Sequence, residues 1–237
     1  MIHRLPSPLI SSLLASALLL TTNVPMHAQD WPNLARYRVA NAALGEATAG
    51  STRVVFMGNS ITEGWAPLFA TQFPGKPYIG RGISGQTTPQ MVLRFHQDVI
   101  ALKPAVVVIL GGTNDIAGNT GPSTLSMIED NLAAMTEMAQ ANGIRVVLCS
   151  VLPVFDYPWK RGLEPAPRIL ALNQWIARYA AEHGATYLDF HSAMADEKHG
   201  MRAELASDGV HPNAAGYAIM ASLVEPAIAE ALKRPDR

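Results

Sequence analysis

Short apolar runs alternate along the chain with longer segments whose apolar residues recur at helical spacing. The short runs are rich in β-branched residues and predict strands at residues 53–57, 78–79, 105–110, 145–150 and 186–188. The longer segments predict helices at residues 88–101, 123–142, 166–183 and 213–232. Gly143 and Gly184 follow two of these helices, at the position where a left-handed residue often ends a helix. Strand and helix in alternation predict an α/β fold, with a parallel sheet covered by helices on both faces.

The first 28 residues differ from the rest of the chain. Arg4 is followed by an apolar stretch at residues 9–20, which has the length of a signal-peptide core and is too short to span a bilayer comfortably. The small residue Ala28 then predicts cleavage before Gln29. A buried N-terminal helix is the alternative, but no polar residues interrupt the run at helical spacing. We therefore expect residues 1–28 to be a signal peptide, residues 29–237 to form a single domain, and the mature protein to be periplasmic or secreted.

Composition narrows the possible partners. The chain has 237 residues, of which 49% are hydrophobic and 16% charged, and its formal net charge is −1. It can bury one sizeable core. No run of basic residues indicates binding to nucleic acid or to an anionic membrane surface, and no stable membrane insertion is expected after cleavage. Cys149 is the only cysteine, so it has no intramolecular disulfide partner, and its apolar neighbours predict a core strand position.

Polar and glycine-rich stretches follow the predicted strands. The first is Gly-Asn-Ser at residues 58–60, and two others lie at residues 80–87 and 111–115. Because the carboxyl ends of parallel strands share one edge of the sheet, these loops should meet there, where α/β proteins bind ligands. Each stretch alone has an ordinary structural explanation. The first two suit tight turns, and Asp115 suits a helix N-cap.

A fourth stretch, residues 207–213, precedes the last predicted helix. Pro212 keeps His211 extended and supplies a favourable first helical residue. Asp208, three residues before His211, can accept a hydrogen bond from the imidazole Nδ1 and leave Nε2 free as a base. Acyl transfer requires a nucleophile, such as Ser60, together with a base, a group that orients the base, and N–H donors for the developing oxyanion.

Taken together in chain order, the four stretches resemble the SGNH or GDSL family of serine esterases and lipases. The blocks that match are Gly-Asn-Ser at 58–60, Gly82, Gly-Thr-Asn-Asp at 112–115, and Asp208 through His211. The resemblance covers roughly the whole mature chain. Two positions depart from the family pattern: Asn59 stands where the family has Asp, and Gly80 stands where Asn is frequent.

This resemblance implies a three-layer α/β/α sandwich of flavodoxin-like type. It also implies a catalytic triad of Ser60, His211 and Asp208. The oxyanion would be held by the backbone N–H groups of Ser60 and Gly82 and by the side-chain amide of Asn114. No metal or organic cofactor is expected. The substrate would be a small-molecule or glycan ester, and the sequence does not indicate an oligomeric state.

Aromatic residues suggest the substrate class. Trp65 and Trp159 lie in segments expected near the crevice, and aromatic faces stack on sugar rings. Together with export, they favour a short acyl ester, such as acetyl, on a carbohydrate; packing is the alternative role of each tryptophan. A lipase or lysophospholipase is the alternative enzyme, and a catalytically inactive carbohydrate-binding module is less favoured. A nucleotide-binding protein is disfavoured because no glycine-rich phosphate motif follows the first strand.

Overall fold

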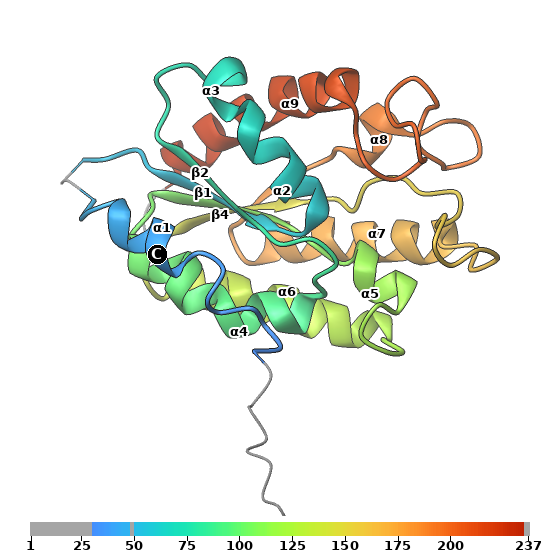
Figure 1. The fold of residues 1–237 in the computed structure, drawn as a ribbon, viewed down its shortest axis with the longest axis horizontal. Helices are drawn as coiled ribbons and strands as arrows, with labels where there is room; N and C mark the ends of the chain where they lie inside the picture. Colours follow the sequence, from blue (N-terminus) through green and yellow to red (C-terminus); the bar gives the residue numbers. More distant parts are fainter. Residues whose placement is uncertain (1–29, 48–49, 235–237) are drawn as a thin grey trace, which may run out of the picture.

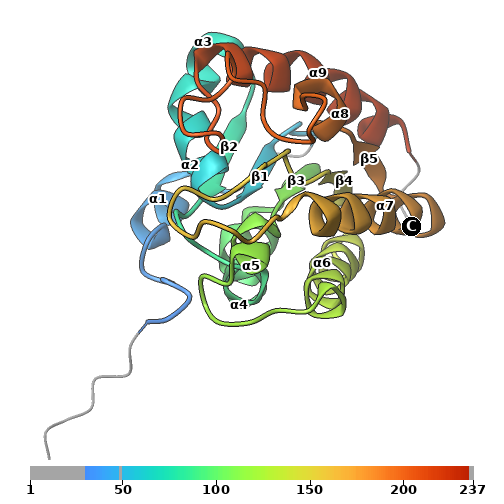
Figure 2. The same ribbon diagram turned by 90° about the vertical axis from the view of Figure 1, so that its right-hand side faces the viewer.

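A parallel five-stranded sheet runs through the middle of the structure, with helices on both faces (Figures 1 and 2). This computed structural model describes residues 30–47 and 50–234. The predicted signal peptide therefore lies outside the described residues. The strands are β1 (Val54–Gly58), β2 (Tyr78–Gly82), β3 (Val106–Leu110), β4 (Arg145–Cys149) and β5 (Thr186–Leu188).

The strand order is β2-β1-β3-β4-β5, which is the order of flavodoxin-like sheets. Every residue of β1 and β3 is buried, as expected for central strands that are covered on both faces. In the parallel register, Gly58 pairs with Gly82 on one side and with Leu110 on the other. The carboxyl ends of β2, β1 and β3 are therefore level, and the loops that follow them begin side by side.

One face of the sheet is covered by α2 (Ser60–Trp65), α3 (Phe69–Gln72) and α9 (Ala214–Lys233), with α8 (His191–Met194) beside α9 (Figure 2). The other face is covered by α4 (Thr88–Asp98), α6 (Leu125–Gln140) and α7 (Ala166–Glu182). The remaining short elements are α1 (Arg38–Ala43), α5 (Thr113–Ala117) and the 3₁₀ turns η1 (Ala66–Leu68) and η2 (Ile100–Leu102). Each face has its own apolar cluster, which confirms the predicted three-layer fold.

The predicted strands and long helices all form, with ends that differ by a few residues. The largest difference is β2, which continues to Gly82 beyond the short apolar run at its start. Gly143 and Gly184 adopt φ values of +69° and +70°, as expected for residues that end helices. Cys149 is buried in β4 as predicted, and burial raises the pKa of its thiol.

Helix α9 has the length and apolar composition of a membrane-spanning helix. In this fold its buried side chains, such as Met220, Val224 and Ile228, pack with Val108 of β3 and Val147 of β4 in one apolar cluster. These contacts account for its composition, because a helix that packs closely on a sheet needs a wide apolar face.

Trp65 lies in the core and not at the surface. Its ring makes an edge contact with Phe56 at a centroid distance of 5.4 Å and stacks on Tyr217 at 6.0 Å, and its indole Nε1 donates to Gln72 Oε1 at 2.7 Å. Only 1% of Trp65 is exposed. This corrects the expectation that Trp65 offers its ring to a sugar, because the ring has no free face.

We predict that Trp65→Ala lowers the free energy of unfolding by about 3–5 kcal/mol, because it empties a large volume between packed rings. Trp159→Ala should cost less than about 1 kcal/mol, since 46% of Trp159 is exposed. Urea unfolding of both variants beside the wild type measures the difference. Equal losses in the two variants would contradict the packing described here.

Candidate active site

Ser60 is the first residue of α2, and the chain reaches it directly from the end of β1. The preceding residue, Asn59, is buried and caps the helix: its Oδ1 accepts a hydrogen bond from the backbone N–H of Ile61 at 3.1 Å. An aspartate could accept the same bond. Asn59 can therefore perform the capping role of the residue that the family motif has at this position, although it lacks the charge.

A continuous hydrogen-bonded chain links Ser60 to two residues that precede α9. Ser60 Oγ lies 2.9 Å from His211 Nε2, and His211 Nδ1 lies 2.6 Å from Asp208 Oδ2. A carboxylate only accepts hydrogen bonds, so Nδ1 carries the proton, and Nε2 of the neutral ring accepts from the serine hydroxyl. The structure thus brings the three predicted residues together, with the imidazole in the tautomer that a general base requires.

Asp208 is fixed through both of its carboxylate oxygens. Oδ1 accepts from the backbone N–H groups of Val210 at 2.9 Å and His211 at 2.8 Å, while Oδ2 faces the imidazole. Partial burial opposes the charge of Asp208, but the hydrogen bonds from His211 and Val210 outweigh it and lower the pKa of the carboxyl below its usual value. Asp208 is therefore a carboxylate at neutral pH.

Gly82 ends β2 beside the start of α2. A Cβ at this position would lie 2.2 Å from the backbone nitrogen of Glu63 and 2.6 Å from the carbonyl oxygen of Asn59, so only glycine fits. The carbonyl of Gly82 accepts a hydrogen bond from the Tyr37 hydroxyl, and the Glu63 carboxylate accepts from the backbone N–H of Ser84 at 2.8 Å. These contacts hold the loop after β2 against the helix that carries Ser60.

Asn114 lies in α5, just after β3, and is buried. One hydrogen of its amide is donated to the backbone carbonyl of Gln86 at 2.8 Å, which orients the side chain. The neighbouring Asp115 accepts from the backbone N–H and the hydroxyl of Thr88, at 3.0 and 2.6 Å. Asp115 therefore caps the start of α4 from another element and does not cap its own helix.

The segment between β4 and α7 brings Trp159 to the site. Its indole ring lies 6.0 Å from the His211 ring between centroids, and its Nε1 donates to Asn119 Oδ1 at 3.3 Å. The buried neighbour Tyr157 anchors the segment to α5, because its hydroxyl lies 2.9 Å from both the hydroxyl and the carbonyl oxygen of Thr113. Burial raises the pKa of Tyr157 to about 12. Tyr157 was not singled out from the sequence, although it lies two residues before Trp159 in the same segment.

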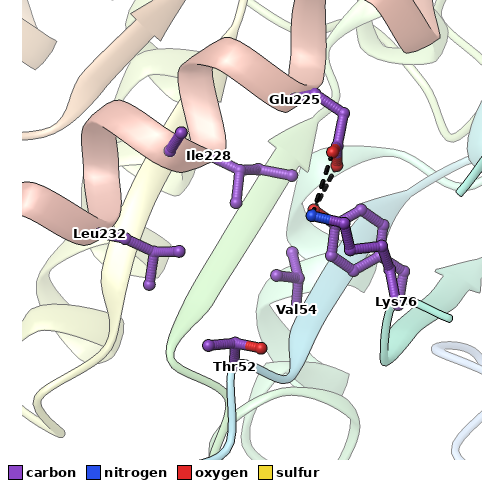
Figure 3. A pocket seen from close by; sticks show the side chains of 8 residues that line it. Thr52, Val54, Lys76, Glu225, Ile228 and Leu232 are labelled. Atoms are coloured by element: carbon purple, nitrogen blue, oxygen red, sulfur yellow. Dashed lines mark hydrogen bonds and ion pairs between the residues drawn. The ribbon is translucent and has the colours of Figure 1, made fainter.

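One cavity lies beside these residues, and another lies at the opposite end of the sheet. One of about 230 Å³ lies beside Asp208 and includes Phe155, Tyr157 and Arg161 in its lining. Another, of about 140 Å³, is lined by Thr52, Val54, Lys76, Tyr78, Glu225, Ile228, Ala229 and Leu232 (Figure 3). Thr52 precedes β1 whereas Ser60 follows it, so the second cavity lies at the opposite end of the sheet. In residues 30–47 and 50–234, no group of three or more His, Cys, Asp or Glu side chains is arranged to hold a metal ion.

Comparison with known proteins identifies the family of the chain. The model of the GDSL-like lipase/acylhydrolase family matches residues 56–219, which include Ser60, Gly82, Asn114, Asp208 and His211. The chain belongs to this family. The chain is similar to the structure of a candidate acylhydrolase from Bacteroides fragilis, with 42% identity, a TM-score of 0.84, and coverage of 86% of this chain and 100% of that one. It is also similar to a GDSL-like lipase from Bacteroides thetaiotaomicron, with 44% identity, a TM-score of 0.82, and coverage of 84% and 98%.

A curated relative adds a named activity. The chain is 26% identical over 212 residues to an acetylxylan esterase from Xylanibacter ruminicola, and the match covers 74% of the chain. The chain spans only 43% of that protein's length. More than half of the relative's length therefore lies outside the match.

We predict that Asp208→Asn reverses the tautomer of His211. The two backbone N–H groups at Oδ1 require an oxygen there, so the amide of the variant must turn its NH₂ toward His211 Nδ1. Nδ1 then accepts, and Nε2 carries the proton. The ¹⁵N shifts of the His211 ring at alkaline pH report this change, and turnover of an ester should fall by about 10⁴-fold.

Asp189→Asn is the matched control, because Asp189 accepts from Ser150 and Ser192 and has no bond to His211. It should leave the His211 shifts unchanged. A wild-type tautomer in the Asp208→Asn variant would contradict the geometry.

Proposed function

We propose that this acylhydrolase is a serine esterase in which Ser60 is the nucleophile, His211 the general base and Asp208 the group that orients and stabilises the imidazolium. The unbroken hydrogen-bonded chain from Ser60 Oγ through His211 to Asp208 is the observation that carries the proposal. Such a chain activates a serine hydroxyl that is otherwise too weakly acidic to attack an ester.

The reaction proceeds in two steps. As Ser60 Oγ attacks the ester carbonyl, its proton moves to His211 Nε2, and the carbonyl oxygen becomes an oxyanion. His211 then gives this proton to the departing alcohol, which leaves an acyl group on Ser60. A water molecule attacks the acyl group with His211 again as base, the acid is released, and the serine recovers its proton.

Three donors are proposed for the oxyanion. The backbone N–H of Ser60 belongs to the first turn of α2, where a helix has no internal acceptor for it. The absence of a side chain at Gly82 lets its backbone approach the same point. Asn114 uses one amide hydrogen on Gln86 and keeps the other. Donors fixed in this way stabilise charge as it develops, without reorganisation.

For the substrate, we propose a short acyl ester, such as an acetyl ester, on a carbohydrate. Trp159 supports this proposal, because an exposed indole beside the base can stack on a sugar that carries the ester. The acetylxylan esterase relative supports it independently, within the limit of its 26% identity. Export to the periplasm or medium is also proposed, from residues 1–28 alone. A lipase or lysophospholipase is the alternative, favoured by the lipase among the similar structures.

We predict that Ser60→Ala and His211→Ala each lower kcat on p-nitrophenyl acetate by about 10³-fold or more. The double variant should be little worse than either single variant, since the two residues act as one unit. Steady-state kinetics with folded protein measure these losses. Ser84→Ala is the matched control, because the contact of Ser84 with Glu63 is made by its backbone N–H and survives the change. Retention of a tenth of the activity in either single variant would refute the assignment.

We predict that kcat/KM falls from acetate to octanoate esters. At Gly82 the end of β2 packs against the backbone at the start of α2. We expect a small acyl pocket beside this rigid junction, in which extra methylenes would stay in water or force repacking. Trp159→Ala should lower kcat/KM for an acetylated xylo-oligosaccharide about tenfold, because it removes the ring on which a sugar would stack. The loss on p-nitrophenyl acetate should be smaller, because this ester carries no sugar.

Trp31→Ala is the matched control: Trp31 is 45% exposed, about as much as Trp159, but lies on the N-terminal segment. It should affect neither substrate. Equal losses on both substrates in Trp159→Ala would make that tryptophan structural, and a rise toward octanoate would favour the lipase.

A further inference from the structure

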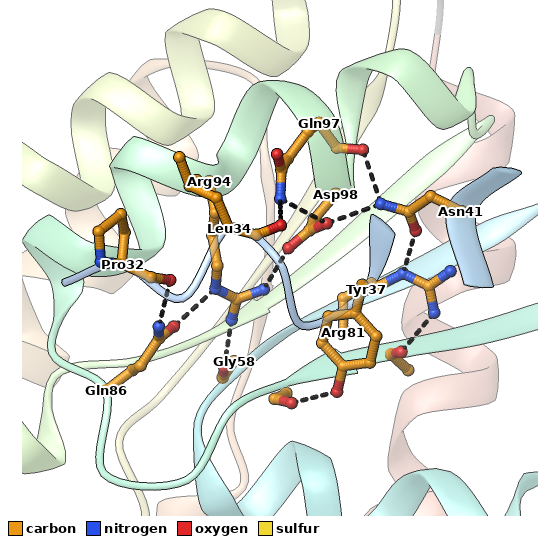
Figure 4. Close-up of polar contacts among 12 residues, drawn as sticks. Pro32, Leu34, Tyr37, Asn41, Gly58, Arg81, Gln86, Arg94, Gln97 and Asp98 are labelled. Atoms are coloured by element: carbon orange, nitrogen blue, oxygen red, sulfur yellow. Dashed lines mark hydrogen bonds and ion pairs between the residues drawn. The ribbon is translucent and has the colours of Figure 1, made fainter. Parts of the chain in front are cut away.

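Arg94 is a fully buried arginine on α4, with 0% of its surface exposed. Burial of a guanidinium is unfavourable unless the charge is paired and its N–H groups are hydrogen-bonded. Arg94 meets this requirement with three partners in different directions (Figure 4). Nη1 donates to Asp98 Oδ2 at 3.0 Å, Nε to Gln86 Oε1 at 2.6 Å, and Nη2 to the carbonyl of Gly58 at 2.8 Å.

Two of these partners belong to the loops of the candidate active site. Gly58 ends β1 two residues before Ser60, and its carbonyl also accepts from the backbone N–H of Ile83, next to Gly82, at 3.2 Å. Gln86 presents its side chain to Arg94, and its backbone carbonyl accepts from the amide of Asn114. One guanidinium thus contacts the residues that orient all three proposed oxyanion donors.

The third partner keeps this guanidinium in place. Asp98 is also fully buried, and its Oδ1 accepts from Asn41 Nδ2 of α1 at 2.8 Å. The N-terminal segment covers the pair from outside, because Gln97 Nε2 donates to the carbonyl of Leu34 at 2.7 Å (Figure 4). The charge is therefore neutralised on the side of α4, and the two other edges of the guanidinium are left to face the loops.

A lysine could not make the same contacts. Its ammonium is a single point on a flexible stem, whereas the planar guanidinium fixes several donors at set angles. Paired with Asp98, an ammonium at position 94 could not also reach Gly58 and Gln86 with this geometry. The three-way contact thus depends on the shape of arginine as well as its charge.

We propose that Arg94 is a positioning residue for the reaction: it holds the end of β1 and the loop after β2 so that the N–H groups of Ser60 and Gly82 and the amide of Asn114 converge on one oxyanion. This role rests on the proposed serine-esterase function. Because the donors act on charge that develops in the transition state, their displacement lowers kcat more than it raises KM.

Arg94→Lys tests the proposal in the full-length protein with p-nitrophenyl acetate. We expect kcat per active site to fall by about 10–100-fold with KM within about threefold, since a displacement near 1 Å has such effects on rate. The number of competent sites is counted from the initial burst of p-nitrophenol, so that unfolded protein does not enter the rate.

Gln86→Met is the second variant. It removes the link between Arg94 and the loop after β2, but keeps the contacts of Arg94 with Asp98 and Gly58 and leaves the backbone carbonyl that binds Asn114. We expect kcat to fall about tenfold. Gln97→Met is the matched control, because Gln86 and Gln97 each donate to a carbonyl of the N-terminal segment but Gln97 has no contact with the loop after β2. The change also removes a long contact of 3.4 Å with Asp98 Oδ1, but Asp98 keeps its shorter bonds from Arg94 and Asn41. It should keep wild-type kcat.

The outcomes separate the two proposals. The wild-type protein could show turnover that depends on Ser60 while Arg94→Lys or Gln86→Met keeps an unchanged kcat. This result would overturn the positioning role alone. The positioning role would also be overturned if kcat fell as much in Gln97→Met as in Gln86→Met, because loosening of the N-terminal segment would then explain both losses. Absence of Ser60-dependent turnover in the wild type would overturn the esterase function and the positioning role with it.

Discussion

The close approach of three strand ends around Gly58 is the constraint on which the rest of the site depends. A Cβ at Gly58 would lie 2.1 Å from Thr62 Oγ1 and 2.9 Å from the carbonyl oxygen of Leu110, so α2 turns directly out of β1 against β3. Gly82 brings β2 equally close on the other side. With the three ends level, side chains and N–H groups far apart in sequence face one small region, as at the ligand-binding edges of other parallel sheets.

The polar groups on the two sides of this region differ in exposure. Behind the loops, Arg94, Asp98 and Asp115 are buried and hydrogen-bonded, which rigidifies the backbone at the cost of desolvation. The His211 and Asp208 side chains, by contrast, are 39% and 37% exposed. This combination suits the proposed hydrolysis, in which the oxyanion donors need a fixed geometry and the base must receive both substrate and water.

The sheet was predictable because its strands are continuous apolar runs, and the long helices because their apolar spacing persists over several turns. The second half of β2 was missed, since Gly80 and Gly82 give no strand signal. The short helices α2 and α5 were also missed, because five or six residues are too few to show a period. The proposed triad was implied by the resemblance of the four sequence blocks to the family, to which the spacing of Asp208 and His211 and the placement of Ser60 after a strand added physical support, and the three side chains lie together in the structure.

The side chains that were misjudged or overlooked depend on packing. Ile61 and Trp65 are four residues apart and share the inner face of α2, a spacing that could have indicated core positions once α2 was recognised. Arg94 and Asp98 lie four residues apart, on the buried face of α4 with Met91 and Phe95. A charged residue on an apolar face is ordinarily assigned to the surface, so their burial could be learned only from the structure.

The account centres on Ser60 as the nucleophile, and trapping of the acyl-enzyme tests it most directly. Protein quenched with acid during turnover of p-nitrophenyl acetate is digested and examined by mass spectrometry. We expect the peptide that contains Ser60 to gain the mass of one acetyl group. In Ser60→Ala, we expect no residue to become acetylated at the rate of turnover. An acetyl group that forms at this rate on another residue, or turnover without any acetylated intermediate in rapidly quenched samples, would contradict the account.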